Sequence, residues 1–130
     1  MILALGGNEM ESILKSIKQL LGIDESETHF DLDVIININS VFSILNQMGV
    51  GPAETFSIID DSSNWSEFID DDARFNDVKT YMFLKVKMAF DPPTNSNILS
   101  AMERQISELE WRLTVCSSNK AMEENENGEK

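Results

Sequence analysis

Apolar residues recur at helical spacing in four stretches of the chain, with polar or glycine- and proline-containing segments between them. Residues three or four positions apart lie on the same side of an α-helix, so each stretch predicts a helix with one apolar face. The predicted helices span residues 9–21, 31–48, 73–90 and 94–115. The pattern therefore predicts a mostly α fold, in which four helices form a compact bundle.

Capping residues and helix breakers set the expected ends of these helices. Asn8 is the expected N-cap of the first helix, with Glu11 completing a capping box, and Gly22 follows its last turn. Asp31 is the expected N-cap of the second helix. Pro92 and Pro93 end the third. Because the link that they form is short, the third and fourth helices are expected to make an antiparallel hairpin.

The segment between the second and third helices differs from the rest. Residues 56–59 predict a short extended piece, and residues 65–69 predict one helical turn. Acidic side chains are dense from residue 54 to residue 77, and Asp71 or Asp72 is the expected cap of the third helix. These acids line a loop and a helix start, so capping and a solvated acidic face explain them.

The sequence predicts one domain flanked by two looser segments. Residues 1–9 are expected to be a loose leader, residues 10–116 the helical bundle domain, and residues 117–130 a flexible, disordered acidic tail. The predicted core is the set of apolar stripe residues, namely Ile17, Leu21, Val34, Ile38, Phe42, Leu45, Val78, Met82, Ile106, Leu109 and Leu113.

The net charge of −13 limits the partners that the chain can bind. Proteins that grip nucleic acid gain most of their affinity from neutralising phosphates, and this chain lacks that contribution. An acidic face can instead meet a basic partner, or line a passage through which DNA slides without sticking. Simple solubility explains the charge equally well, so these three interpretations stay open.

Candidate chemistry is sparse in this sequence. His29 and Cys116 are the only histidine and cysteine, they lie far apart, and neither belongs to a catalytic motif. The acids around Asp60 and Asp70 do not follow the alternating pattern of a calcium loop. No apolar run approaches the roughly 20 residues of a membrane span. We therefore expect no catalytic residue, no metal, no cofactor and no membrane insertion, and we expect that the protein is not an enzyme.

Several stretches resemble the small head–tail connector, or adaptor, proteins in the neck of long-tailed bacteriophages. The resemblance covers roughly residues 31–115. It rests on VFSILNQMGVG at 41–51, VKTYMFLKV at 78–86, FDPP at 90–93 and ISELEWRL at 106–113.

The resemblance implies a structural virion protein at the portal vertex of the capsid, which assembles in the host cytoplasm. It implies a homo-oligomeric ring, usually a dodecamer, that docks under the portal protein, extends the DNA channel and offers a surface to the next neck or tail-completion protein. DNA then passes through the lumen without specific binding. The alternative from another functional class is an acidic phage regulatory protein that binds a host protein or mimics the charge of DNA.

Surplus apolar and charged side chains suggest the faces that a ring needs. The subunit interface is expected at Trp65, Phe68, Asp70, Asp71, Asp72, Lys79, Tyr81, Phe83, Lys85 and Lys87. The portal-facing surface is expected at Trp111, Arg112, Val115, Asn119 and Lys120. Ile35 and Ile36 widen the apolar face of the second helix, so this helix is expected to touch neighbours on more than one side.

Overall fold

The computed structural model describes residues 11–70 and 72–128, with side chains described for residues 11–70 and 73–115. The described part contains five helices, and no strand is present in it. The helices are α2 (Ile13–Leu21), α3 (Asp31–Gln47), α4 (Trp65–Phe68), α5 (Asp72–Phe90) and α6 (Ser96–Gly128). The predicted mostly α fold is confirmed: α2, α3, α5 and α6 correspond to the four predicted helices, and α4 to the predicted single turn.

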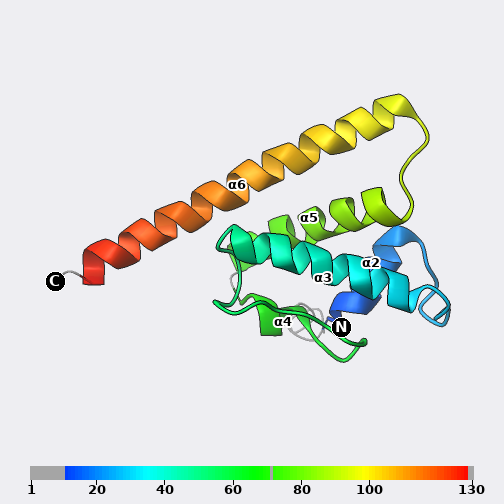
Figure 1. Cartoon of the computed structure of the whole chain (residues 1–130), viewed down its shortest axis with the longest axis horizontal. Helices are drawn as coiled ribbons and strands as arrows, with labels where there is room; N and C mark the ends of the chain where they lie inside the picture. The colour runs from blue at the N-terminus through cyan, green and yellow to red at the C-terminus, as the bar shows by residue number, and fades with distance from the viewer. Residues whose placement is uncertain (1–10, 71, 129–130) are drawn as a thin grey trace.

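Helix α5 holds the other long helices together. It contacts α2 and α3 on one side and α6 on another, and α2 also contacts α3. Figure 1 shows α6 running back along α5 after the link at residues 91–95, which is the expected antiparallel hairpin. The C-terminal part of α6 extends beyond the other helices (Figure 1).

The first described helix begins later than the sequence predicts. The predicted cap Asn8 lies outside the described residues, and the N-cap is Ser12, whose side chain accepts a hydrogen bond from the backbone N–H of Lys15 at 3.2 Å. Ser12 is extended because the chain there pairs with the segment before α4. The N–H of Ile13 donates to Ser63 O at 3.0 Å, and the N–H of Trp65 donates to Glu11 O at 3.1 Å. This backbone pairing, which the helical pattern does not reveal, takes the place of the predicted helix at residues 11 and 12.

A buried lysine joins α2 to α3. The side chain of Lys18 is only 4% exposed, and its Nζ lies 2.8 Å from the Asp31 carboxylate. The same Nζ donates to the backbone carbonyls of Glu25 at 3.3 Å and Glu27 at 2.6 Å. The prediction that Asp31 caps the helix is wrong, since Phe30 occupies the N-cap and Asp31 is in the first turn. A buried ammonium needs a carboxylate partner, and Asp31 supplies it.

The segment before α4 folds across α3 and contributes aromatic side chains to the core. The Asn39 side chain clamps the backbone of Ile58, accepting from its N–H at 2.8 Å and donating to its carbonyl at 3.0 Å. The ring centroid of Phe42 lies 4.6 Å from that of Phe68 and 5.0 Å from that of Phe56. Gly51 has φ of +90° and lies against the Phe68 ring, where a Cβ atom would clash. The loop is therefore a packed part of the bundle.

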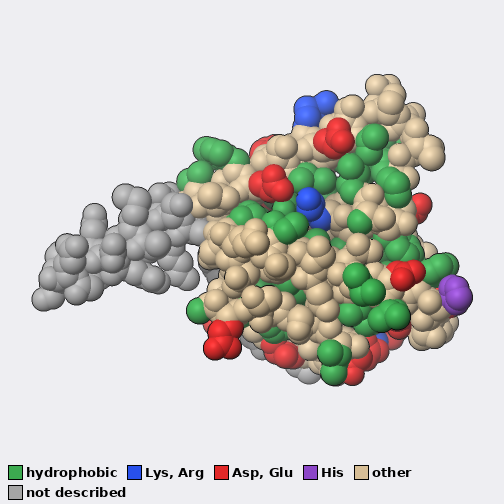
Figure 2. Space-filling view, viewed as in Figure 1, with side chains coloured by type: hydrophobic (Ala, Val, Ile, Leu, Met, Phe, Trp, Pro, Cys, Tyr) green, Lys and Arg blue, Asp and Glu red, His purple; other side chains and the backbone are tan. Residues whose placement is uncertain are grey.

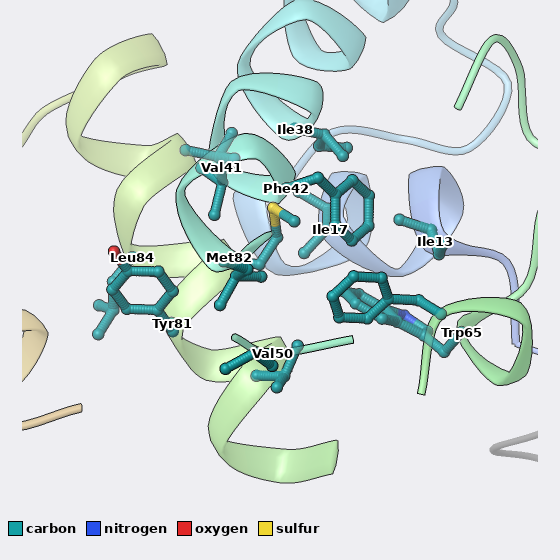
Figure 3. Packing of buried hydrophobic residues seen from close by; sticks show 14 of the residues in the cluster. Ile13, Ile17, Ile38, Val41, Phe42, Val50, Trp65, Tyr81, Met82 and Leu84 are labelled. Atoms are coloured by element: carbon teal, nitrogen blue, oxygen red, sulfur yellow. The ribbon is translucent and has the colours of Figure 1, made fainter. Parts of the chain in front are cut away.

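Trp65 anchors this loop to α2. Its indole Nε1 donates to the Ser16 hydroxyl at 2.8 Å, and its ring packs edge-on against Phe75 with centroids 5.7 Å apart. Figure 3 shows Trp65 beside Ile13, Ile17 and Phe42. An indole N–H that is fully buried needs an acceptor, and Ser16 provides one inside the core.

Ten of the eleven predicted core residues are buried, and Leu21 is half-buried against the same core. The structure adds buried residues that the predicted set leaves out. They are Ile13, Leu14, Val41, Val50, Ile58, Trp65, Phe68, Phe75, Tyr81, Leu84 and Val86. Several of them come from the loop before α4, or from flanks of helices that the single stripes do not include.

The predicted end of the last helix near Val115 is wrong, because α6 continues to Gly128. Lys120, Ala121 and Met122 favour helix, and no proline interrupts residues 116–128. The expected disordered tail thus coincides with further helical turns in this structure. The division at residue 117 into a bundle and a separate flexible tail stays a prediction.

We expect truncation of Leu45 or Leu109 to alanine to destabilise the protein by about 2–5 kcal/mol, because each substitution leaves a cavity in a buried site. Leu32 is 69% exposed, so Leu32→Ala serves as the control and should change stability by less than about 0.5 kcal/mol. Denaturant unfolding measures all three. A loss below about 1 kcal/mol at both Leu45 and Leu109 would show that the core is assigned wrongly.

Candidate interaction surface

Polar contacts near the middle of α6 hold this helix against α5. The phenol of Tyr81 donates to Glu110 Oε2 at 2.9 Å. Arg112 bridges the two helices, with Nη1 3.2 Å from Asp77 of α5 and Nη2 2.7 Å from Glu108 of α6. These bonds set the rotation of α6 about its axis, and so decide which of its side chains face outward.

The Tyr81 phenol is uncharged and donates its hydrogen bond to Glu110 over the whole physiological pH range. Burial is the main cause that raises the pKa of its phenol well above the ordinary value, and the hydrogen bond to Glu110 and the charge of that carboxylate add to it. The phenol therefore keeps its proton and its hydrogen bond.

A groove of about 650 Å³ lies between α3, α5 and α6. Its apolar lining comes from Val41 and Ile44 of α3, Met88 of α5 and Ile106 of α6. Figure 2 shows hydrophobic side chains gathered between α6 and α3 on this face of the molecule. The hairpin thus leaves apolar surface open along one side of α6.

A second hollow of about 370 Å³ continues the groove toward the start of α3. It is lined by Phe30 and Ile36 of α3 and its N-cap, and by Phe90 at the end of α5. The two hollows share Asn37 and Ala89. Ile36 is 58% exposed in this hollow. The wide apolar face that the sequence predicts for α3 is therefore an open surface at Ile36, and not a second buried contact within the chain.

Lys85 gives the groove its positive charge. Its side chain is half-buried on the groove wall. It makes no ion pair with any residue whose side chain the structure describes. Glu103 and Glu110 line the same groove from α6, and Glu110 already accepts the Tyr81 hydrogen bond. The groove therefore combines an apolar floor with charges on its walls.

The structure buries three residues that the sequence assigns to the subunit interface. Trp65 and Tyr81 are 0% exposed and Phe68 is 5% exposed. This part of the prediction is corrected, because side chains inside the monomer's own core cannot contact a neighbour. The cause is the packed loop before α4 and the hairpin over Tyr81, neither of which is visible in single-helix patterns.

The other predicted interface residues divide between internal pairs and open surface. Lys79 is bound to Glu11 at 2.8 Å, and Lys87 to Asp91 at 3.0 Å. Phe83 is half-buried against the core. Asp70 is exposed, whereas Asp71 and the side chain of Asp72 lie outside the described part of the structure. Of the three lysines in the set, only Lys85 lines the groove.

The predicted portal-facing residues lie on α6. Trp111 is 67% exposed, Val115 is half-buried, and Arg112 is engaged with Asp77 and Glu108. Asn119 and Lys120 belong to the outer turns of α6, where side chains are not described. Whether these residues face the portal stays a prediction.

Within the part of the chain that the structure describes, no three His, Cys, Asp or Glu side chains are placed to hold a metal ion. No described helix combines the length and apolar character needed to cross a membrane.

Comparison with known proteins identifies one family. The model of the phage connector protein family matches residues 13–120, from the start of α2 into the outer turns of α6. No curated protein and no solved structure matches the chain. The match extends the resemblance seen in the sequence to α2, which completes the set of helices around the core.

Alkaline titration tests the Tyr81 contact, because Tyr81 is the only tyrosine in the chain. The raised pKa predicts that tyrosinate absorbance of the folded protein appears well above pH 10, the ordinary midpoint being about 10. Stability from this group is full below about pH 10 and falls as pH rises further, since the unfolded chain ionises first. Tyr81→Phe should remove that part of the pH dependence. A midpoint near 10 in the folded protein would contradict the buried contact.

Proposed function

The chain belongs to the phage connector protein family, and we propose that it acts as a head–tail connector, forming a ring under the portal protein of a long-tailed phage. The observation that carries the proposal is the family match, which covers the whole helical bundle. We propose a structural role rather than an enzymatic one, in which the ring extends the DNA channel and docks the next neck or tail-completion protein. By analogy with the family, we propose twelve copies in the ring.

The shape of the chain supports a role in joining two layers of an assembly. The part of α6 beyond Val115 adds about 20 Å to a helix that already leaves the body (Figure 1). A helix that projects from a small domain gains most of its stability from packing against something else. We propose that the outer turns, with Asn119 and Lys120, reach the portal protein.

The charge of the chain supports a DNA channel. The net charge is −13, and several of the basic side chains are engaged internally, as Lys18 and Lys79 are with Asp31 and Glu11. A lumen that carries DNA should repel phosphates weakly rather than bind them. We propose that exposed acids such as Asp60 and Asp70 give the ring this property, and that DNA passes without specific binding.

The test is made in the phage that encodes the chain. Particles produced without this protein should contain DNA-filled heads that fail to join tails, and supplying the protein in trans should restore joining. Electron microscopy of the neck should place the protein between portal and tail. Normal tailed particles without the protein would contradict the proposal. A free monomer that competes with DNA for a basic host protein would instead support the regulatory alternative.

Removing residues 117–130 should leave the body folded and weaken incorporation into particles. The buried α6 residues Ile106, Leu109 and Leu113 all precede the cut, so the melting temperature should change little, and the helical signal in circular dichroism should fall only by the turns that are removed. Incorporation is measured by quantifying the protein in purified particles, with the full chain as the control. Unchanged incorporation would show that the outer turns of α6 do not hold the chain in the neck.

A further inference from the structure

Two surfaces that involve α6 lie on different sides of the helix. One side contributes Glu103 and Ile106 to the groove between α3, α5 and α6. The other carries Arg104, Glu108 and Trp111, which we call the ridge. These three follow one another at spacings of four and three, so they share one side of the helix. None of the ridge residues lines the groove.

We infer that the ridge of one copy of the chain docks into the groove of a second copy, with Trp111 as the apolar anchor and with Lys85 of the groove paired to Glu108 of the ridge. This inference rests on the ring proposed above, and it names the two surfaces through which neighbouring subunits meet.

Apolar surface on both sides supports this pairing. Trp111 is 67% exposed, which is a large fraction for the largest apolar side chain in a protein. Tryptophan is enriched among residues that dominate binding at interfaces, where it fills a desolvated pocket. The groove offers about 650 Å³, with an apolar floor at Ile44, Met88 and Ile106. The ridge thus offers an exposed apolar side chain, and the groove offers an apolar hollow that can receive it.

The charges on the two surfaces are complementary. In the groove, Lys85 has no ion-pair partner among the described side chains, and on the ridge the Glu108 side chain is 64% exposed beside Trp111. On the ridge, Arg104 is exposed and makes no ion pair among the described side chains. Glu108 lies four residues after Arg104, but it pairs with Arg112 instead. Glu103 on the groove wall can receive Arg104. Opposite charges on both surfaces of one chain favour a second copy as the occupant.

The two surfaces also give the contact a direction. A contact between two different faces is heterologous, so the subunits at the two ends of a growing assembly each keep one free face. Such a contact builds a ring where the rotation between subunits closes, as in the ring proposed above, and it does not build a two-fold dimer. It moves Trp111 from the expected portal surface to the subunit contact, and it leaves the outer turns of α6 for the portal.

The experiment measures self-association of the full chain by sedimentation and native mass spectrometry over a concentration series. The wild type should form oligomers larger than a dimer at high concentration. Trp111→Ala and Lys85→Glu should each weaken association by about tenfold or more, because each removes one half of the contact. Both side chains lie outside the core, so melting temperatures should stay near that of the wild type.

Matched controls separate this contact from general surface effects. Ile59→Ala removes an apolar side chain that is 84% exposed and lies on neither surface. Lys87→Glu makes the same charge change as Lys85→Glu on the same helix, at a residue that does not line the groove. Both controls should associate like the wild type.

Mixing the two defective variants gives the sharpest result. Trp111→Ala keeps an intact groove and Lys85→Glu keeps an intact ridge, so a mixture of the two variants should form heterodimers, whereas each variant alone stays monomeric. These heterodimers should not grow into rings, because their two remaining faces are the defective ones. The inference is overturned if the wild type stays monomeric throughout, if the controls weaken association as much as the two variants, or if mixing restores nothing. A different result would contradict the proposed connector function, namely that particles without the protein still join tails normally.

Discussion

The attachment of α6 to the rest of the molecule depends on its packing against α5. The apolar side of α6 at Ile106, Leu109 and Leu113 is buried, and the Tyr81–Glu110 hydrogen bond fixes its rotation. Because α6 lies along α5 and leaves a groove against α3, Ile44 and Met88 stay accessible. Had α6 closed onto α3 as well, the bundle would have no groove and Lys85 would be covered. The open surface is thus a consequence of how one helix pair is joined.

The part of the bundle around α2, the start of α3 and the loop before α4 is held together by polar contacts within the chain. Lys18 ties α2 to the start of α3, Trp65 ties the loop before α4 to α2, and Asn39 clamps that loop at Ile58. All three contacts satisfy buried polar groups inside one chain, so these groups need no partner protein. The groove and the exposed Trp111 lie around α6, which is also the helix that reaches beyond the body (Figure 1).

Helical periodicity predicted the four long helices, and ten of the eleven stripe residues that it predicted for the core are buried. The reason is that each helix buries one face, and the spacing of its apolar residues identifies that face. Contacts between segments that are distant in the sequence produce no periodic pattern of apolar residues. The pairing of Ser12 with Asn64 moved the start of α2, and the burial of Trp65 and Phe68 depends on how a loop crosses α3. The sequence predicted Lys85 for the subunit interface and Trp111 for the portal-facing surface, and both assignments stay predictions. Only the packed hairpin shows which sides of α6 are open, and it is the basis for our proposal that the two residues belong to one contact.

We propose that the chain assembles through the side formed by α6 and the groove, rather than through the side formed by α2 and α4. Hydrogen exchange of the free chain, compared with the chain bound to its portal protein, distinguishes the two sides. We expect new protection in α6 and in the groove segments of α3 and α5, with little change in α2 and at residues 56–68. New protection concentrated at residues 56–68, with α6 unchanged, would contradict it.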